Sequence, residues 1–235
     1  MRINLQEPLP FEGTGLEYPA IMMPALIGTP AQAIVKSHID IDDFIMWLNG
    51  TAGRAPEVNN YAVSTVAEHL MAMANSMPSC VDTWMISKTD DRDVWEDGCI
   101  FDGILRSRRK PVSENDLMDE WPIDQLQFVI YSVAPYSTGL TTEYDDYHLL
   151  LRRFVLQRAL ERRHAGITDG QAMFNHPVVI SPYSNIHDDA QLANELQVIE
   201  KAKDINGAYV RHVEKTWGHK KRTEWWHILD DSNLL

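Results

Sequence analysis

The stretch from Thr141 to Gly166 constrains the fold most, because it carries the start and stop signals of a long helix. Thr142 can cap the first free amides, with Asp145 three residues later. Acidic residues gather at its start and basic ones at its end, which suits the helix dipole. The apolar side chains between the ends cover more than one face of a helix: Tyr147, Leu149, Leu150, Leu151, Phe154, Val155 and Leu156. We therefore expect a buried central helix that other segments surround.

The first 36 residues combine proline with apolar side chains. Five of the twelve prolines fall in the first thirty positions, which argues against a long helix or a central strand. A flexible linker would be polar, whereas this segment is rich in leucine, isoleucine and methionine. We expect an extended arm that lies either on its own domain or on a neighbouring subunit.

Between the arm and the central helix, the pattern predicts several short elements. Periodicity favours a helix over 42–49, a second over 60–77 that ends at Pro78, and a third over 113–121. Residues 124–133 are apolar enough for a buried helix. Two β-prone runs within 79–112, CVDTWMIS and GCIFDGILR, predict a hairpin or a pair of strands.

After Gly166 the chain turns extended and then helical. The run HPVVISPYSN is extended, and Asn185 or Asp188 opens a long helix that reaches about Trp217. The predicted fold class is mainly α, with an α+β fold left open. It has a helical core around a buried central helix, a small β-hairpin, an extended N-terminal arm and a long C-terminal helix. The predicted segments are 1–36, 37–183 and 184–235, the last ending in a basic and aromatic tail.

Charge and cysteine content restrict the function classes. The net charge of −13 disfavours bulk nucleic acid and anionic membranes as partners, although local basic patches can still act. Cys80 and Cys99 show no metal-ligand spacing and are too few for a disulfide scaffold. No secretion signal or credible membrane span appears, so we expect a soluble protein of the cytoplasm, or of a virion.

Two clusters resemble metal-ligand sets. His38, Asp40 and Asp42 would share one face of an extended segment, with Asp43 next to them. The competing interpretation is that the carboxylates cap the following helix. His187, Asp188 and Asp189 lie where a helix begins, and capping is again the simpler explanation. We therefore predict no metal ligands.

Sequence motifs of catalysis are absent. The chain lacks a GxSxG elbow, a GxGxxG fingerprint and a phosphate-binding loop, and its SxxK, Ser107 to Lys110, lies in the charged run RSRRK. The stretch NYAVSTVAEHLMAMA resembles a loop-to-helix segment of the 2-hydroxy acid dehydrogenases. The other motifs of that family do not follow in order, so the resemblance implies no function. We predict no catalytic residues and no cofactor, and lean against an enzyme.

Basic residues alternate with aromatic ones in the tail, HKKRTEWWH. This chemistry suits docking in a groove or stacking on bases, and the acidic net charge favours a protein partner. Packing of the tail on its own domain is the alternative. The predicted partner-contact residues are Trp217, Lys220, Lys221, Arg222, Trp225, Trp226 and Ile228.

Together these features predict a structural or assembly subunit of a homo-oligomer that docks through its arm and tail. Connector and adaptor proteins of tailed-phage virions have this general organisation, which is an analogy of architecture. Two alternatives remain: a metal-dependent, hydrolase-like enzyme whose site is assembled from distant residues, and a nucleic-acid-contacting factor.

Overall fold

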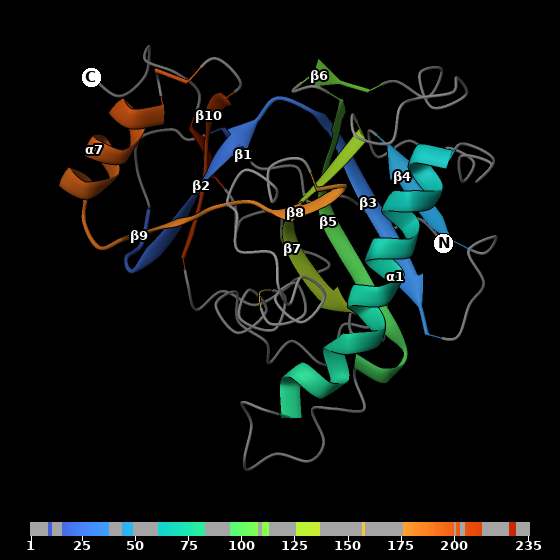
Figure 1. The fold of residues 1–235 in the computed structure, drawn as a ribbon. Coiled ribbons are helices and arrows are strands. Elements are labelled where there is room, and N and C mark those ends of the chain that lie inside the picture. Colours follow the sequence, from blue (N-terminus) through green and yellow to red (C-terminus); the bar gives the residue numbers. More distant parts are fainter. Residues whose placement is uncertain are drawn as a thin grey trace.

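The computed structural model describes just under half of the chain. The described residues are 9–10, 16–37, 44–48, 61–82, 95–107, 110–112, 126–136, 157, 176–199, 201–202, 205–212 and 226–228. Within them the chain forms eleven strands and two helices, and the strands make two sheets (Figure 1).

The first sheet, called sheet A, joins segments from both ends of the sequence. Its strands, in spatial order, are β1 (Leu9–Pro10), β11 (Trp226–Ile228), β10 (Ile205–His212), β2 (Ala20–Leu26) and β9 (Ser184–Ile186). β1 runs parallel to β11, and the other neighbours are antiparallel. Sheet A therefore depends on pairing between residues far apart in sequence, as in His212 opposite Ala20.

The second sheet, sheet B, comes mostly from the middle of the chain. Its strands, in spatial order, are β4 (Ile45–Leu48), β3 (Thr29–Lys36), β5 (Gly98–Ser107), β7 (Leu126–Pro135) and β8 (Val178–Ile180), with β6 (Lys110–Pro111) paired to β5. Only β8 runs parallel to its neighbour, β7. β5 and β7 are buried along almost their whole length, which indicates that both faces of sheet B are covered.

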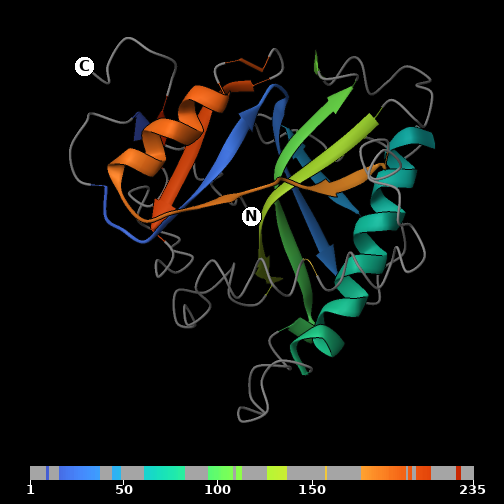
Figure 2. The ribbon, with the colours of Figure 1, turned by 60° about the vertical axis from the view of Figure 1, so that its left-hand side comes forward.

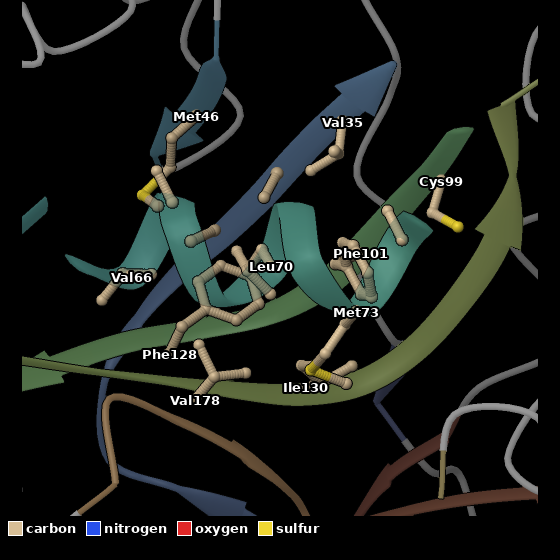
Figure 3. Packing of buried hydrophobic residues seen from close by; sticks show 14 of the residues in the cluster. Val35, Met46, Val66, Leu70, Met73, Cys99, Phe101, Phe128, Ile130 and Val178 are labelled. Atoms are coloured by element: carbon tan, nitrogen blue, oxygen red, sulfur yellow. The ribbon is translucent and has the colours of Figure 1, made fainter. Parts of the chain in front are cut away.

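A helix covers the outer face of each sheet, so the described elements form four layers (Figure 2). Helix α1 (Tyr61–Asp82) places Val66, Leu70 and Met73 against sheet B, where they meet Phe101 and Phe128 (Figure 3). Helix α7 (Asp189–Ile199) packs Leu192 and Leu196 against sheet A. Apolar residues at three- and four-residue spacing form α1, and full burial of a leucine there contributes roughly 1.5–3 kcal/mol.

The chain passes directly from sheet A to sheet B between β2 and β3. Gly28 lies at this passage, and a Cβ there would come 2.7 Å from Ile104 Cδ1. Gly103 is similarly confined in β5, where a Cβ would lie 2.0 Å from Val129 O. A side chain at position 28 would therefore collide with Ile104, and one at position 103 would collide with the neighbouring strand β7 of the same sheet.

The predicted mainly α fold is wrong. Residues 124–133 do not form a helix, because Leu126–Pro135 is strand β7. The predicted helix over 42–49 contains strand β4 instead. The predicted long C-terminal helix ends at Ile199, and β10 follows it. The extended arm is not an appendage in the described residues, since it supplies β2 and β3 to the two sheets.

Other predicted elements are confirmed. The helix over 60–77 is α1, although it continues through Pro78 to Asp82, so the predicted stop is wrong. Nearby hydroxyls bond to helix carbonyls there: Ser76 Oγ donates to Met73 O at 2.7 Å. The GCIFDGILR run is β5, whereas the Cys80–Asp82 part of the other run ends α1. The central helix, apart from Gln157, and the helix over 113–121 lie outside the described residues. The division into three segments stays a prediction.

Candidate functional site

The two sheets meet in an apolar layer, called here the inter-sheet layer. Ile21 and Met23 of β2 contact Ile104 of β5 and Val129 and Tyr131 of β7. Leu26, Val179 and Tyr209 pack around this cluster. Alternation along the strands places the cluster on the face of sheet B opposite α1. This layer joins the two halves of the described structure.

Tyr131 ties sheet B to sheet A. Its hydroxyl accepts a hydrogen bond from Leu26 N at 2.9 Å and donates one to Pro24 O at 3.1 Å. Its ring meets Tyr209 of β10 edge to face, with the centroids 5.2 Å apart. Burial, then the neighbouring Tyr209, raises the pKa of Tyr131 far above its usual range. Tyr131 is therefore neutral and fixed by both its hydroxyl and its ring.

A row of polar side chains crosses the centre of sheet B on the face turned to sheet A. Gln32 of β3 lies opposite Asp102 of β5, and Asp102 lies opposite Ser132 of β7. A bulge in β7 beside Ser132 places this residue on the same face as Tyr131. Burial and then the Asp102 carboxylate raise the pKa of Tyr209, which places Asp102 close to the Tyr209 phenol. We call these three residues the polar row.

Two members of the polar row are buried without hydrogen-bond partners in the described structure. Gln32 is 1% exposed and Ser132 is 2% exposed. Neither the Gln32 amide atoms nor Ser132 Oγ has a hydrogen bond to any described residue. An unsatisfied buried polar group costs about 1–3 kcal/mol, so such groups in a protein call for an explanation. A ligand that supplies their hydrogen bonds is one explanation.

A series of linked hydrogen bonds borders the inter-sheet layer at β5, β7 and the residues before β8. Arg106 Nε and Nη2 donate to Gln127 Oε1 at 3.0 and 2.8 Å. Gln127 Nε2 in turn donates to His176 O at 2.9 Å. Arg106 is close enough to Tyr131 to lower its pKa, against the larger effect of burial. Arg106 is only 8% exposed, so it is not a surface member of the basic RSRRK run.

The predicted docking tail is described only at β11. Trp226 lies opposite Val210 and Ile228 lies opposite Ala208 in the register of β10 and β11. Trp217, Lys220, Lys221, Arg222 and Trp225 lie outside the described residues. Partner contact by these seven residues stays a prediction.

The structure also locates one of the two metal-like clusters. Asp188 caps α7, because Gln191 N donates to Asp188 Oδ1 at 2.8 Å, and this confirms the capping interpretation. Asp189 accepts a hydrogen bond from Tyr18 Oη. His38, Asp40, Asp42 and Asp43 lie outside the described residues, within which no group of three or more metal-ligand side chains occurs. None of the helices described is long and apolar enough to cross a membrane.

Pattern analysis of the sequence missed the polar row, although a signal was present. Each member is a lone polar residue within an apolar run: AQAIV, IFDGIL and VIYSVA. A single polar side chain in an otherwise buried strand is expensive unless it is paired or functional. The row becomes visible only when the strand register brings the three residues together.

Comparison with known proteins gives similarity at the level of the fold. No family model and no curated protein matches the sequence. Among solved structures, the ATP-dependent DNA ligase from bacteriophage T7 in complex with ATP matches with a TM-score of 0.58 and 14% identity, over 95% of this chain and 67% of the ligase. A mycobacterial DNA ligase D complexed with ATP and MES matches with a TM-score of 0.53 and 10% identity, over 97% of this chain and 60% of that one. The ligase Pmar-Lig matches with a TM-score of 0.54 and 11% identity, over 90% of this chain and 42% of that one.

These comparisons correct the predicted function. The prediction of a structural subunit of a homo-oligomer, of the virion connector kind, depended on a helical core whose arm and tail dock on other chains. The described parts of the arm and the tail are instead strands of the two sheets. The chain has the fold of the ATP-dependent DNA ligases.

Proposed function

We propose that this chain is a nucleotide-dependent enzyme that acts on nucleic acid and holds its nucleotide at the inter-sheet layer. The observation that carries the proposal is the polar row, with Gln32 and Ser132 buried and without hydrogen-bond partners among the described residues. The fold adds support, since two of the neighbours are ligases with ATP bound. Sites for small ligands commonly combine an apolar lining with a few polar groups, as this layer does.

The chemistry of the polar row matches that of a nucleoside. A primary amide both donates and accepts hydrogen bonds, and so does a hydroxyl. Base edges and ribose hydroxyls offer both kinds of partner, so Gln32, Asp102 and Ser132 can each pair with such a ligand. Binding would then relieve the cost of about 1–3 kcal/mol that each unsatisfied group imposes on the free protein.

The two tyrosines offer a surface for the base. Stacking of a base on an aromatic side chain contributes about 1–3 kcal/mol. Tyr131 and Tyr209 are in contact in the present structure, with ring centroids 5.2 Å apart. A base that stacks on Tyr131 therefore takes the place of Tyr209, and β10 has to move relative to β7. Nucleotide binding should consequently change the surroundings of both phenols.

The proposal predicts opposite effects of one substitution on stability and on binding. In Gln32→Leu the unsatisfied amide is replaced by an apolar side chain of similar size, so the free protein should be as stable as wild type or more stable. ATP affinity should fall by at least about 10-fold, which corresponds to one lost pair of hydrogen bonds. Thermal unfolding and calorimetric titration with Mg-ATP measure the two effects.

A matched control separates the site from the general effect of the substitution. Gln197→Leu makes the same chemical change on the exposed surface of α7 and should leave ATP affinity unchanged. Ser132→Ala should weaken ATP binding in the same direction as Gln32→Leu. Wild-type ATP affinity in both Gln32→Leu and Ser132→Ala would show that the polar row does not bind the nucleotide.

A second function is favoured by the apolar character of the layer. Aliphatic side chains flank the polar row on both sides, Ile34 and Ile100 on one and Ile104 and Val129 on the other. Such groups bind a base or sugar but do not carry out phosphoryl chemistry. The alternative is therefore a protein that binds nucleotide without transferring it. Sealing of a nicked DNA duplex, followed with pyrophosphate release from ATP, distinguishes the two: turnover supports the enzyme, and binding without turnover supports the alternative.

A further inference from the structure

Two short connections join the two sheets. Within the described elements the chain crosses from sheet A to sheet B at residues 27–28, between β2 and β3, and returns at residues 181–183, between β8 and β9 (Figure 1). Connections of two or three residues between strands are the kind of segment that absorbs the backbone rotation of a hinge. The two connections together therefore have the form of a hinge between the sheets.

Tyr131 bonds across this hinge. Its hydroxyl accepts a hydrogen bond from Leu26 N at 2.9 Å and donates one to Pro24 O at 3.1 Å, at the end of β2 that leads into the first connection. The preceding residue, Ile130, accepts a hydrogen bond from Ser181 N at 2.9 Å, at the start of the second connection. The side chain of Tyr131 is only 8% exposed. One buried hydroxyl therefore holds the two sheets together directly beside both connections.

The nucleotide site proposed above is closed in the described conformation. Gln32 and Ser132 are 1% and 2% exposed, and the ring of Tyr131 is in contact with Tyr209. A nucleotide therefore reaches the polar row only after the sheets move apart. Because Tyr131 is next to Ser132 in β7, the hydrogen bonds that restrain the hinge lie beside the row itself.

We propose that the Tyr131 hydroxyl locks the hinge and so keeps the proposed nucleotide site closed in the free protein. The inference rests on the proposed function, because it concerns access to the same site. When only an open conformation binds a ligand, the apparent affinity is lowered by the fraction of protein that is open. The two hydrogen bonds of Tyr131 stabilise the closed conformation, so their loss increases the open fraction and the affinity together.

Tyr131→Phe tests the lock, because it removes the hydroxyl and keeps the ring on which a base can stack. In calorimetric titration with Mg-ATP the variant should bind at least about threefold more tightly than wild type, since the closed conformation loses two hydrogen bonds. Stopped-flow measurement should show the gain in the association rate, because more of the protein is open before ATP arrives. A hydroxyl with a structural role alone would leave the affinity unchanged or lower it. Tyr136→Phe makes the same change beside Lys36 and should leave both values unchanged.

A second measurement uses the wild-type protein and does not depend on the folding of a variant. Amide hydrogen exchange followed by NMR reports on Leu26 N–H, whose acceptor is the Tyr131 hydroxyl. Saturating Mg-ATP should speed exchange at Leu26, because opening of the hinge removes this acceptor. The Phe128 amide, which donates to Pro177 O at 2.7 Å at the other end of β8, should exchange no faster.

The outcomes separate the lock from the proposed function. If neither the wild type nor Tyr131→Phe binds ATP, the proposed function is wrong and the lock falls with it. If the wild type binds ATP and a folded Tyr131→Phe protein binds it equally or more weakly, the lock alone is overturned. Leu26 exchange that ATP slows or leaves unchanged would overturn the lock in the same way.

Discussion

Among single residues, Tyr131 has the most specific role, because its hydroxyl bonds to two backbone groups of the opposite sheet. Tyr131→Phe leaves Leu26 N without this acceptor and should destabilise the protein by about 1–3 kcal/mol. Tyr136→Phe is a suitable control, since the ring stays beside Lys36 Nζ. Urea unfolding at neutral pH measures both; equal effects of the two substitutions would contradict the role of the Tyr131 hydroxyl.

The same residue affects the pH dependence of stability. Tyr131 keeps its proton in the folded state far above pH 10, whereas an unfolded tyrosine loses it near pH 10. Above that pH the unfolded state binds fewer protons, so stability falls as pH rises, by up to about 1.4 kcal/mol per pH unit for each such group. The Tyr131→Phe protein lacks this contribution, so its urea midpoints should decline less steeply between pH 9 and 11.

At the scale of elements, the cap of α7 gives a direct prediction. Asp188 Oδ1 accepts a hydrogen bond from Gln191 N, and Gln191 Oε1 accepts one from His187 N. Asp188→Ala should therefore lower the free energy of unfolding by about 1 kcal/mol, and Asp188→Asn should restore most of it. Chemical denaturation of the three proteins measures this. If Asp188→Asn is as unstable as Asp188→Ala, the cap is not the cause.

Elements with one buried face were predictable from the sequence, and elements buried on both faces were not. The 3.6-residue period of α1 is clear because its other side faces solvent in part. β7 is buried at all ten positions, so no period distinguishes it from a buried helix. Its aromatic and β-branched residues, Phe128, Val129, Ile130 and Tyr131, were the remaining evidence for a strand.

The prolines of the first segment misled the interpretation for a different reason. Proline is expected to exclude a central strand, yet Pro24 and Pro30 lie in β2 and β3. β9 pairs only with residues 20–22 of β2, and β4 pairs only with residues 31–34 of β3. Each proline lies just beyond the reach of one neighbouring strand, where a backbone N–H has no strand partner to lose. The length of the neighbours, which local sequence does not reveal, decides the outcome.

At the scale of the whole molecule, the layers predict a gradient of local stability. β5 lies between β3 and β7 and is buried on both faces, whereas α7 covers sheet A with one exposed side. Amide hydrogen exchange should be slowest in β5 and faster in α7, because local opening is easiest where few apolar contacts are broken. Mass spectrometry of peptides from these elements checks this, and equal protection would contradict the gradient.

The proposed site could not be found from sequence alone, because it belongs to the assembled sheets. Gln32, Asp102 and Ser132 come from three strands separated by long stretches, and only the register places them in one row. Local patterns can identify candidate residues, whereas a site of this kind is a property of the topology.

The passage from β2 to β3 has a consequence for how the protein is made on the ribosome. Sheet B needs nothing beyond residue 180, whereas β2 obtains its long antiparallel partner only when residues 205–212 have emerged. During synthesis, strand β2 with Ile21 and Met23 is therefore attached to a sheet that can already form, while one edge of β2 is still unpaired. Nascent chains stalled before residue 205 should consequently be the form that chaperones bind.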